Sequence, residues 1–359
     1  MKKIWLMLGV IILSTLSVLG GCAPTSTPAE KYSLKFTFPA PSIGPGAETA
    51  EWFGQEIKQR TNERAEIEIF WGGALLKPGE GLDGIAQGIA DMGPVINPYA
   101  HEKLLITNAL RDGTGFMGLD MIGACDAFWK LAEKYPQIEE EYLAQNQKVL
   151  AFNTGGNVHL ISTVPIRKME DFKGLRVRAG SPLTKLISET TRATPIGIKA
   201  SEAYEALERG VIDATHGDFD YMNSYKYYEV AKHFTYIDLG SAPPMTAITI
   251  NLDKWEELPS DIQRVMLDVG QRYHEVYGEK YYEQVEAIRE HWREEGVKFY
   301  ELPPEDYEKM RTHPAVEELR GKGVEKLEAK GLPGQEMMDE FVKLLEQLAS
   351  ESRLKRVID

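Results

Sequence analysis

Asp171-Phe-Lys-Gly-Leu-Arg-Val-Arg178-Ala-Gly-Ser181 is the stretch that decides the fold, because it predicts a turn, a short strand and a helix start in direct succession. A Lys-Gly pair supplies the turn. In the strand that follows, Leu175 and Val177 alternate with Arg176 and Arg178. Side chains alternate between the two faces of a strand, so we expect both arginines on the face opposite the apolar pair.

Arg178 is the strongest candidate for a ligand-binding residue. It ends the predicted strand and is followed by Gly180 and Ser181, so its guanidinium is expected at the carboxyl end of the strand, where α/β sheets bind ligands. A guanidinium fork matches a carboxylate through two parallel hydrogen bonds. We therefore predict that Arg178 binds an anion, with Ser181 beside it. The alternative is that Arg176 and Arg178 are ordinary solvated charges on a half-exposed strand.

The N-terminus has the features of an export signal. Lys2 and Lys3 precede an apolar run, residues 4–18, that is too short for an ordinary membrane-spanning helix. Leu19-Gly20-Gly21-Cys22 resembles a bacterial lipobox, in which the cysteine is lipidated. Residues 1–21 are therefore predicted to be a lipoprotein signal peptide, and residues 22–31 a flexible tether. A plain cleaved signal or a signal anchor is the alternative, and the rest of the chain is expected outside the cytoplasm.

The charge balance is acidic. The formal net charge is −14, and −16 once Lys2 and Lys3 are removed with the signal. A basic surface for nucleic acid or anionic membranes is therefore excluded, and an arginine that binds an anion must act against the overall field. Lipidation of Cys22 would leave Cys125 alone, so no disulfide is expected, and the apolar helical stripe around Cys125 places it in the core.

The first part of the chain predicts alternating strands and helices. Apolar residues alternate with polar ones over 34–38 and 67–71, residues 91–96 read as a buried strand, and helical spacing covers 50–57 and 81–88. This order indicates a mixed or parallel sheet covered by helices.

The pattern restarts after Met169. Strands are predicted at 175–178, 194–198 and 211–214, with helices at 182–191 and 202–208. Two further strands, 149–152 and 246–250, are expected to cross between two lobes and to form their hinge. The predicted fold is a two-lobed α/β fold of the periplasmic binding protein type. Its first lobe comprises residues 32–152 with 246–275, and its second lobe residues 153–245 with 276–359.

Residues 260–296 predict one long helix. Apolar and aromatic residues keep helical spacing from Ile262 to Trp292, and Ser260 with Gln263 matches a capping box. At ~1.5 Å per residue this helix would be about 50 Å long and would lie across both lobes. The alternative is two helices separated near Gly278.

Together these residues resemble the solute receptors of tripartite ATP-independent periplasmic (TRAP) transporters, over nearly the whole mature chain. In that family the strand arginine, here Arg178, pairs with the carboxylate of an organic acid, and a long helix bridges the two lobes. The motifs that carry the resemblance are Asp171–Arg178, Thr194-Pro-Ile, Ser201-Glu-Ala-Tyr204, Ala206-Leu-Glu-Arg-Gly-Val-Ile-Asp213 and Asn251-Leu-Asp-Lys-Trp255 with Leu258-Pro-Ser.

The chain departs from this family in two places. Receptors for sialic acid have a second ligand arginine about twenty residues earlier, a place that falls near His159, and a neutral imidazole is a weaker anion partner. After Asp213 the chain reads Ala-Thr-His-Gly-Asp where members often have Gly-Gln/Val-Glu-Asn/Gly-Pro. The resemblance implies that His216, Asp218 and Phe219 face the ligand. Because Asp218 is acidic, a monocarboxylate with a polar or aromatic body is expected more than a dicarboxylate.

Other candidate ligand residues are chosen from their place in loops. Tyr99 follows a strand of the first lobe, Phe116 lies in a glycine-rich loop, and Asn153 and Asn157 follow a hinge strand. Each of them has a purely structural alternative. Some family members for keto acids hold a cation that bridges to the acid, and Asp218 with Asp220 is the acidic pair that could do so here. No further oxygen ligand can be named, so this stays the alternative, and neither a metal nor a cofactor is expected.

The resemblance implies a non-catalytic extracytoplasmic receptor, anchored by lipid, that closes on an organic acid and delivers it to TRAP membrane subunits for uptake driven by an ion gradient. A receptor of an ATP-driven importer is the nearest alternative. An exported enzyme is a weaker one, since Gly113-x-Gly-x-x-Gly118 matches a dinucleotide fingerprint only if a strand precedes it. A purely structural lipoprotein would bind no organic acid.

Overall fold

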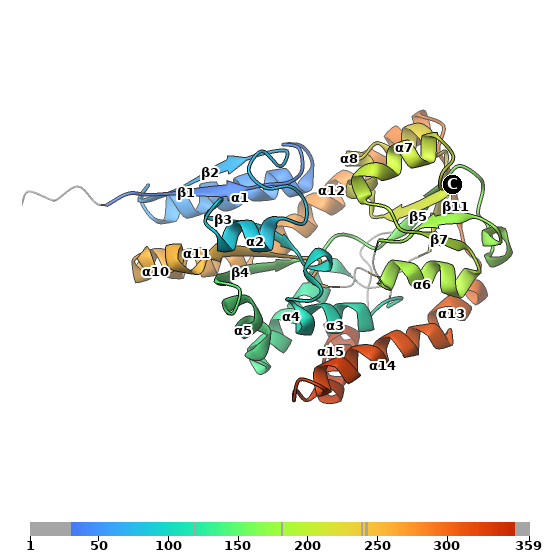
Figure 1. Cartoon of the computed structure of the whole chain (residues 1–359). Coiled ribbons are helices and arrows are strands. Elements are labelled where there is room, and N and C mark those ends of the chain that lie inside the picture. Colours follow the sequence, from blue (N-terminus) through green and yellow to red (C-terminus); the bar gives the residue numbers. More distant parts are fainter. Residues whose placement is uncertain (1–29, 118–119, 181, 238–239, 241–242, 349–359) are drawn as a thin grey trace, which may run out of the picture. The chain divides into compact units, whose positions relative to one another are not determined.

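Two β-sheets organise the chain. The computed structural model describes residues 30–117, 120–180, 182–237, 240 and 243–348. The predicted signal peptide, the lipidation site Cys22, nearly all of the tether and Ser181 lie outside the described residues. Figure 1 shows the helices and strands along the chain. None of the helices in the described part combines the length and the apolar character that a membrane span needs.

The first sheet has the strand order β2-β1-β3-β10-β4. β1 is parallel to β2 and β3, whereas β10 is antiparallel to β3 and β4. The early strand–helix alternation therefore forms a mixed sheet, as the sequence predicts. The bounds are β1 Tyr32–Thr37, α1 Pro45–Arg60, β2 Ala65–Phe70, α2 Gly81–Ala86, β3 Met92–Ile96, β4 Gln147–Asn153, β10 Thr246–Asn251 and α10 Leu252–Glu257.

The second sheet has the order β11-β9-β5-β8-β6-β7. β6 is parallel to both β7 and β8, so the carboxyl ends of these three strands meet at one edge. The bounds are β5 His159–Ser162, β6 Arg176–Arg178, α6 Pro182–Thr191, β7 Thr194–Ile196, α7 Ala203–Glu208, β8 Ala214–Gly217, α8 Phe219–Ser224, α9 Tyr227–Val230, β9 His233–Tyr236, β11 Lys298–Glu301 and α13 Pro304–Arg311. We call the two sheets with their helices the first and second lobes.

The predicted strand at 211–214 is shifted in the structure. The backbone N–H groups of Val211 and Ile212 both donate to the Ala206 carbonyl oxygen, so these residues extend the C-terminal turn of α7. The strand β8 begins only at Ala214. Because these two N–H groups bond to the end of the helix, they are not available to a neighbouring strand, and residues 211–212 do not belong to β8.

The hinge strands are confirmed as neighbours in the first sheet. β4 and β10 pair with each other from Thr246 opposite Asn153 to Asn251 opposite Gln147. β4 leads through residues 154–158 to β5, and the chain returns from β9 to β10 through residues 237–245. These two passages between the sheets thus begin or end at this strand pair, and a third runs from β10 through α10, α11 (Ser260–Gln271) and α12 (Tyr273–Glu294) to β11.

The single helix expected over 260–296 is two helices. α11 spans Ser260–Gln271 and α12 spans Tyr273–Glu294, with the break at Arg272 rather than near Gly278. The Arg272 N–H donates to the Val269 carbonyl oxygen three residues back, which tightens the turn and ends the regular ladder. α12 contacts α1, α4 and β4 of the first lobe and α8 of the second, so it is the helix that spans both lobes.

The predicted capping box at the start of α11 is also wrong. The Gln263 side chain donates to the Trp255 carbonyl oxygen at 2.7 Å, and the residue before the helix, Pro259, makes no side-chain cap.

The C-terminal helices pack mainly on the first lobe. α14 (Pro314–Glu328) lies against α3 (Leu105–Gly113) and also contacts α6 of the second lobe, and α15 (Gly334–Leu348) lies against α4 (Met121–Lys134), as Figure 1 shows. α5 (Gln137–Leu143) contacts α3 and α4. Leu327, Phe341 and Leu345 share one core cluster with Leu110 and Phe128. These C-terminal residues were expected in the second lobe, because their apolar spacing predicts helices without showing which surface they cover.

Candidate functional site

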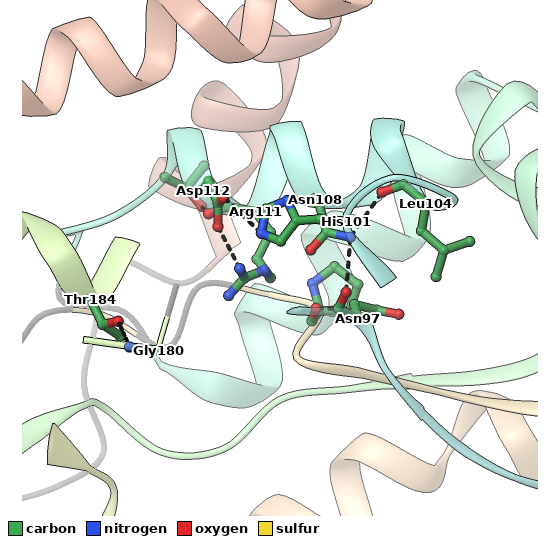
Figure 2. Close-up of polar contacts among 10 residues, drawn as sticks. Asn97, His101, Leu104, Asn108, Arg111, Asp112, Gly180 and Thr184 are labelled. Atoms are coloured by element: carbon green, nitrogen blue, oxygen red, sulfur yellow. Dashed lines mark hydrogen bonds and ion pairs between the residues drawn. The ribbon is translucent and has the colours of Figure 1, made fainter. Parts of the chain in front are cut away.

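Arg178 is the last residue of β6, and backbone groups hold its side chain at the carboxyl end of that strand. Its Nε donates to the Ile198 carbonyl oxygen at 3.3 Å, and the following turn is fixed by the Gly180 N–H, which donates to Thr184 Oγ1 at 3.0 Å (Figure 2). Arg178 is only 6% exposed. In the described part of the chain no carboxylate forms an ion pair with it. A buried cation without an anion is costly, so this arrangement favours an anionic partner from outside the chain.

His216 lies beside Arg178 on the neighbouring strand β8. Its Nε2 is 3.4 Å from Arg178 Nη1. A guanidinium can only donate, so Nε2 is the acceptor and the imidazole proton lies on Nδ1. Burial, and then the charge of Arg178, hold the pKa of His216 well below its usual range. His216 is therefore neutral and leaves Arg178 as the positive charge of this edge.

Arg176 has a different environment, although it lies on the same strand. Its Nε and Nη2 donate to the two carboxylate oxygens of Asp213, at 3.0 and 2.7 Å, and its backbone N–H donates to the same carboxylate at 2.7 Å. Arg176 is also much more exposed than Arg178. The two arginines of the motif thus differ: one is satisfied by its own chain at the surface, and the other is buried without a carboxylate.

Asp218 follows β8 and caps the helix α8. Its Oδ1 accepts from the Tyr221 N–H at 2.8 Å. Burial, helped by the nearby charge of Asp220, raises the pKa of Asp218 to about 7. Gly155 brings the loop after β4 against this carboxyl, since a Cβ there would lie 2.1 Å from Asp218 Oδ2. A carboxyl that is partly protonated at neutral pH repels a second ligand carboxylate less than its acidic residue type alone suggests.

Asn153 and Asn157 belong to the same passage between the sheets. The Oδ1 atoms of both are buried, and no donor in the described residues reaches them. Asn157 is 5% exposed as a whole. Buried polar atoms are normally satisfied, so these two oxygens are available to a hydrogen-bond donor on a ligand.

Phe219 and His159 lie in an aromatic cluster of the second lobe. The Phe219 ring is stacked on Phe234 at 4.7 Å, and it is 5.9 Å from the His159 ring, with ring centroids as the reference points. Phe219 and His159 are each 1% exposed. The structure thus gives both of them a packing role and presents neither to an incoming ligand in this conformation.

Phe116 is buried in the second lobe's core and has a positive φ of 64°. Its carbonyl oxygen accepts a hydrogen bond from the Tyr307 hydroxyl at 3.0 Å. Tyr99, in the short 3-10 helix Asn97–Ala100, is 49% exposed. Of the predicted site residues, the structure therefore brings together Arg178 with His216, and Asp218 with the loop that carries Asn157.

Three tyrosines that were not predicted as site residues, Tyr221, Tyr225 and Tyr227, lie close enough to Arg178 for its charge to lower their pKa values. Tyr221 and Tyr225 lie 4.9 Å apart, and Tyr225 is stacked on Tyr227 at 5.7 Å and 19°, measured between ring centroids and ring planes. Four of the eight residues from Tyr221 to Tyr228 are tyrosine, a composition signal that could have drawn attention to this segment.

A separate polar cavity lies between α3, α6 and α14. Its volume is about 440 Å³, and none of the predicted site residues lines it. In the adjoining cluster Arg111, which is fully buried, donates to Asp112 Oδ1 at 2.5 Å, while His101 Nε2 lies 3.4 Å from Asp112 Oδ2 (Figure 2). Ionisable side chains line the cavity: His101, whose pKa burial lowers, and the charged residues Asp112, Lys185, Glu189, Glu318, Lys322 and Lys326.

Neither a dinucleotide-binding loop after a strand nor a group of metal ligands is found in the described residues. Gly113 ends the helix α3, so the glycine fingerprint at 113–118 follows a helix and not the strand that dinucleotide binding requires. Gly118 itself lies outside the described residues. Within the described ranges no three His, Cys, Asp or Glu side chains are grouped so that they could hold a metal ion.

Comparison with protein families gives one match that covers most of the chain. Residues 39–319 match the sequence model described as "Bacterial extracellular solute-binding protein, family 7". A curated relative, the C4-dicarboxylate-binding periplasmic protein DctP of Rhodobacter capsulatus, is 25% identical over 265 residues, 71% of this chain and 75% of the relative. Matches to curated relatives span from 47% to 94% of the relatives' own lengths.

Solved structures have the same fold. A TRAP periplasmic solute-binding protein from Desulfovibrio salexigens, in an open complex, is 25% identical with a TM-score of 0.75 and covers 91% of this chain and 99% of its own. A TRAP solute-binding protein from a marine metagenome, specific for aromatic acid ligands and solved with 3-hydroxybenzoate, is 20% identical with a TM-score of 0.77. It covers 89% of this chain and 99% of its own. The two-lobed α/β architecture is therefore that of TRAP solute-binding proteins.

Proposed function

Because the chain belongs to family 7 of the bacterial extracellular solute-binding proteins, we propose that it captures an organic acid by closure of its two lobes and delivers the acid to TRAP membrane subunits. The proteins of this family and their structural neighbours are solute-binding receptors rather than enzymes. The membrane subunits would then drive uptake with an ion gradient. Arg178 would bind the carboxylate, and the polar groups around it would contact the body of the acid.

The observation that carries the proposal is the environment of Arg178. Its guanidinium is buried at a strand edge, and within the described ranges only the Ile198 carbonyl oxygen and His216 lie in hydrogen-bonding range of it. A bound carboxylate would supply the missing negative charge through two parallel hydrogen bonds. His216 is neutral, so it does not neutralise the positive charge of Arg178, and the negative charge must come from the ligand.

The known relatives support a carboxylate as the common feature of the ligand. The Rhodobacter capsulatus relative binds C4-dicarboxylates, and the marine receptor binds aromatic acids. These ligands differ in size and charge but share a carboxylate, which is the group that Arg178 is suited to bind.

We also propose that the receptor is anchored outside the cytoplasm by a lipid on Cys22, with residues 22–31 as the tether. The support is the lipobox-like sequence and the run of Ala, Pro, Ser and Thr after it. Mass spectrometry of the protein from its native membrane should show a diacylglyceryl modification at Cys22. A Cys22→Ser variant recovered in the membrane fraction to the same extent as the unaltered protein would sink this part of the proposal.

A ligand screen tests the function as a whole. Purified protein without residues 1–21 would be heated in the presence of mono-, di-, keto- and aromatic carboxylic acids, with the corresponding amides as neutral controls. We expect at least one acid to raise the unfolding temperature and its amide to leave it unchanged, because ligand binding to the folded state stabilises it by mass action. A protein that no acid stabilises, or one that turns an acid over, would contradict the proposal.

A further inference from the structure

We propose that the three tyrosines beside Arg178, Tyr221, Tyr225 and Tyr227, form a stacking surface that selects carboxylic acids carrying a flat aromatic ring. The inference rests on the proposed function, which assigns the carboxylate to Arg178, and it goes further by assigning the body of the ligand. We call these three residues the tyrosine platform.

The backbone builds the platform by a sharp turn. Lys226, between α8 and α9, has a positive φ of 56°, so the chain turns between Tyr225 and Tyr227. The two rings consequently stack at 5.7 Å with only 19° between their planes, and the Tyr221 ring stands 6.0 Å from Tyr227 at 73°. This left-handed conformation is uncommon for a residue with a side chain, which indicates that the surrounding contacts hold the turn in place.

The same backbone segment anchors the platform and the arginine. The Tyr227 hydroxyl donates to the Ala200 carbonyl oxygen at 2.9 Å, and Arg178 Nε donates to the Ile198 carbonyl oxygen two residues earlier. On the other side, the Tyr221 ring packs against Gly217, where a Cβ would lie 2.5 Å from the ring, and Gly217 follows the His216 that faces Arg178. Arg178 and the platform are thus tied together at two points.

The pKa shifts of two platform tyrosines also indicate that Arg178 is near them. Burial raises the pKa values of Tyr221 and Tyr225, while the charge of Arg178 lowers both. The phenol of Tyr99, from the first lobe, raises both of them.

The three rings of the tyrosine platform differ in how far they are exposed. Tyr227 is fully buried and supports the surface from beneath, whereas Tyr221 and Tyr225 are only partly buried. Tyrosine presents a large and rigid face at little cost in conformational entropy. Aromatic pairs gain stability from offset or edge-to-face contacts at about 4.5–7 Å beyond the area that they bury. An aromatic ring carried by an Arg178-bound carboxylate would extend this stack.

Calorimetric titration with matched ligands tests the inference. Benzoate and 3-hydroxybenzoate are compared with cyclohexanecarboxylate, which has the same carboxylate and a ring of similar size without an aromatic face. We expect an aromatic acid to bind about 2- to 10-fold more tightly than cyclohexanecarboxylate, the range for one aromatic contact. Tyr225→Phe should retain this preference and Tyr225→Leu should abolish it, because only the second change removes the ring.

The outcomes separate this inference from the proposed function. Equal affinity for the aromatic and saturated acids, or an aromatic preference that survives Tyr225→Leu, overturns the tyrosine platform as the selecting element. Tight binding of a sugar acid or an aliphatic acid together with no binding of aromatic acids also overturns it, but leaves Arg178 as the carboxylate ligand. If Arg178→Ala changes the affinity for none of the acids, the proposed function fails together with the inference.

Discussion

At the scale of single residues, the paired arginines of β6 show how burial distinguishes side chains with the same chemistry. Arg176 is satisfied by Asp213 at the surface, and Arg178 is buried beside a neutral His216. Exposed ion pairs of the first kind contribute little stability, whereas a buried guanidinium without a carboxylate favours an external anion. The sequence motif thus combines a structural arginine and a ligand-binding one, two positions apart.

Asp218 gives a prediction at the same scale. Burial raises its pKa from 3.8 to about 7. Below about pH 4 the carboxyl is protonated in both the folded and the unfolded state, so it has no effect on stability. Between about pH 4 and 7 the unfolded chain loses this proton while the folded protein keeps it, so stability falls as the pH rises. Above about pH 7 the full penalty, roughly 4 kcal/mol from the size of the shift, is present.

The Asp218→Asn variant should remove this penalty, because asparagine can still accept the Tyr221 N–H as a helix cap but does not ionise. We expect the variant and the unaltered protein to have similar free energies of unfolding near about pH 4, and the variant to be the more stable at about pH 7.5. Burial also raises the pKa of Glu141 to about 7. Glu141 therefore gives the free energy of unfolding the same pH dependence in both proteins, and this contribution cancels when the two proteins are compared. Urea denaturation measures the free energy of unfolding of both proteins at each pH. A difference between the two proteins that stays constant over this pH range would contradict the expected effect of Asp218.

Which candidate residues line a ligand site could be predicted only in part from the sequence. The alternation around Arg178 predicts its position at the strand edge, since the period of two is set by strand geometry. Phe116 was chosen from its place in a loop and Phe219 from the family resemblance, but the rings of both lie in packed cores. The tyrosine platform depends on the left-handed turn at Lys226, which no residue type at that position announces.

At the scale of elements, close approach explains the glycines of the long helical segment. Gly270 and Gly278 both lie inside regular helix, although a break near Gly278 was the alternative that the sequence left open. A Cβ at Gly270 would lie 2.1 Å from the Leu150 carbonyl oxygen of β4, and one at Gly278 would lie 2.5 Å from the Ile122 side chain of α4. The glycines thus let the helices approach their neighbours. Helical periodicity continues on both sides of Arg272, so periodicity alone could not locate the break.

Gly270→Ala tests this role. The added methyl group would have to displace the β4 backbone, so we expect a loss of about 1–3 kcal/mol in the free energy of unfolding, the usual cost of overpacking. Gly321, in α14, is the matched control, because a Cβ there meets no atom within 4 Å. Gly321→Ala should stabilise the protein by about 0.5–1 kcal/mol, since alanine is the better helix former. Guanidinium denaturation of the two variants measures both changes, and equal effects would argue against a close-contact role for Gly270.

At the scale of the whole molecule, the sequence predicts the strands of the first sheet better than those of the second. β4 and β10 fall where strands were expected, whereas β5, β9 and β11 of the second sheet were not predicted. The alternation of segments gives no strand order. α15 packs on the first lobe although it was expected in the second, and α14 contacts both lobes, because an amphipathic helix shows that it has a partner but not which one. The ligand site depends on such long-range packing, which is why its polar groups were harder to predict than its central arginine.

The central claim, that Arg178 holds a carboxylate for a transport receptor, is tested most directly by calorimetric titration of the acid that gives the largest thermal shift. Arg178→Ala should weaken binding by about 2–5 kcal/mol, roughly 30- to 5,000-fold. Arg178→Lys should recover part of the loss, because lysine keeps the charge but not the fork. Arg176→Ala, whose guanidinium is already paired with Asp213, should stay within a few-fold of the unaltered protein. Unchanged affinity in Arg178→Ala, with the variant folded, would contradict the account.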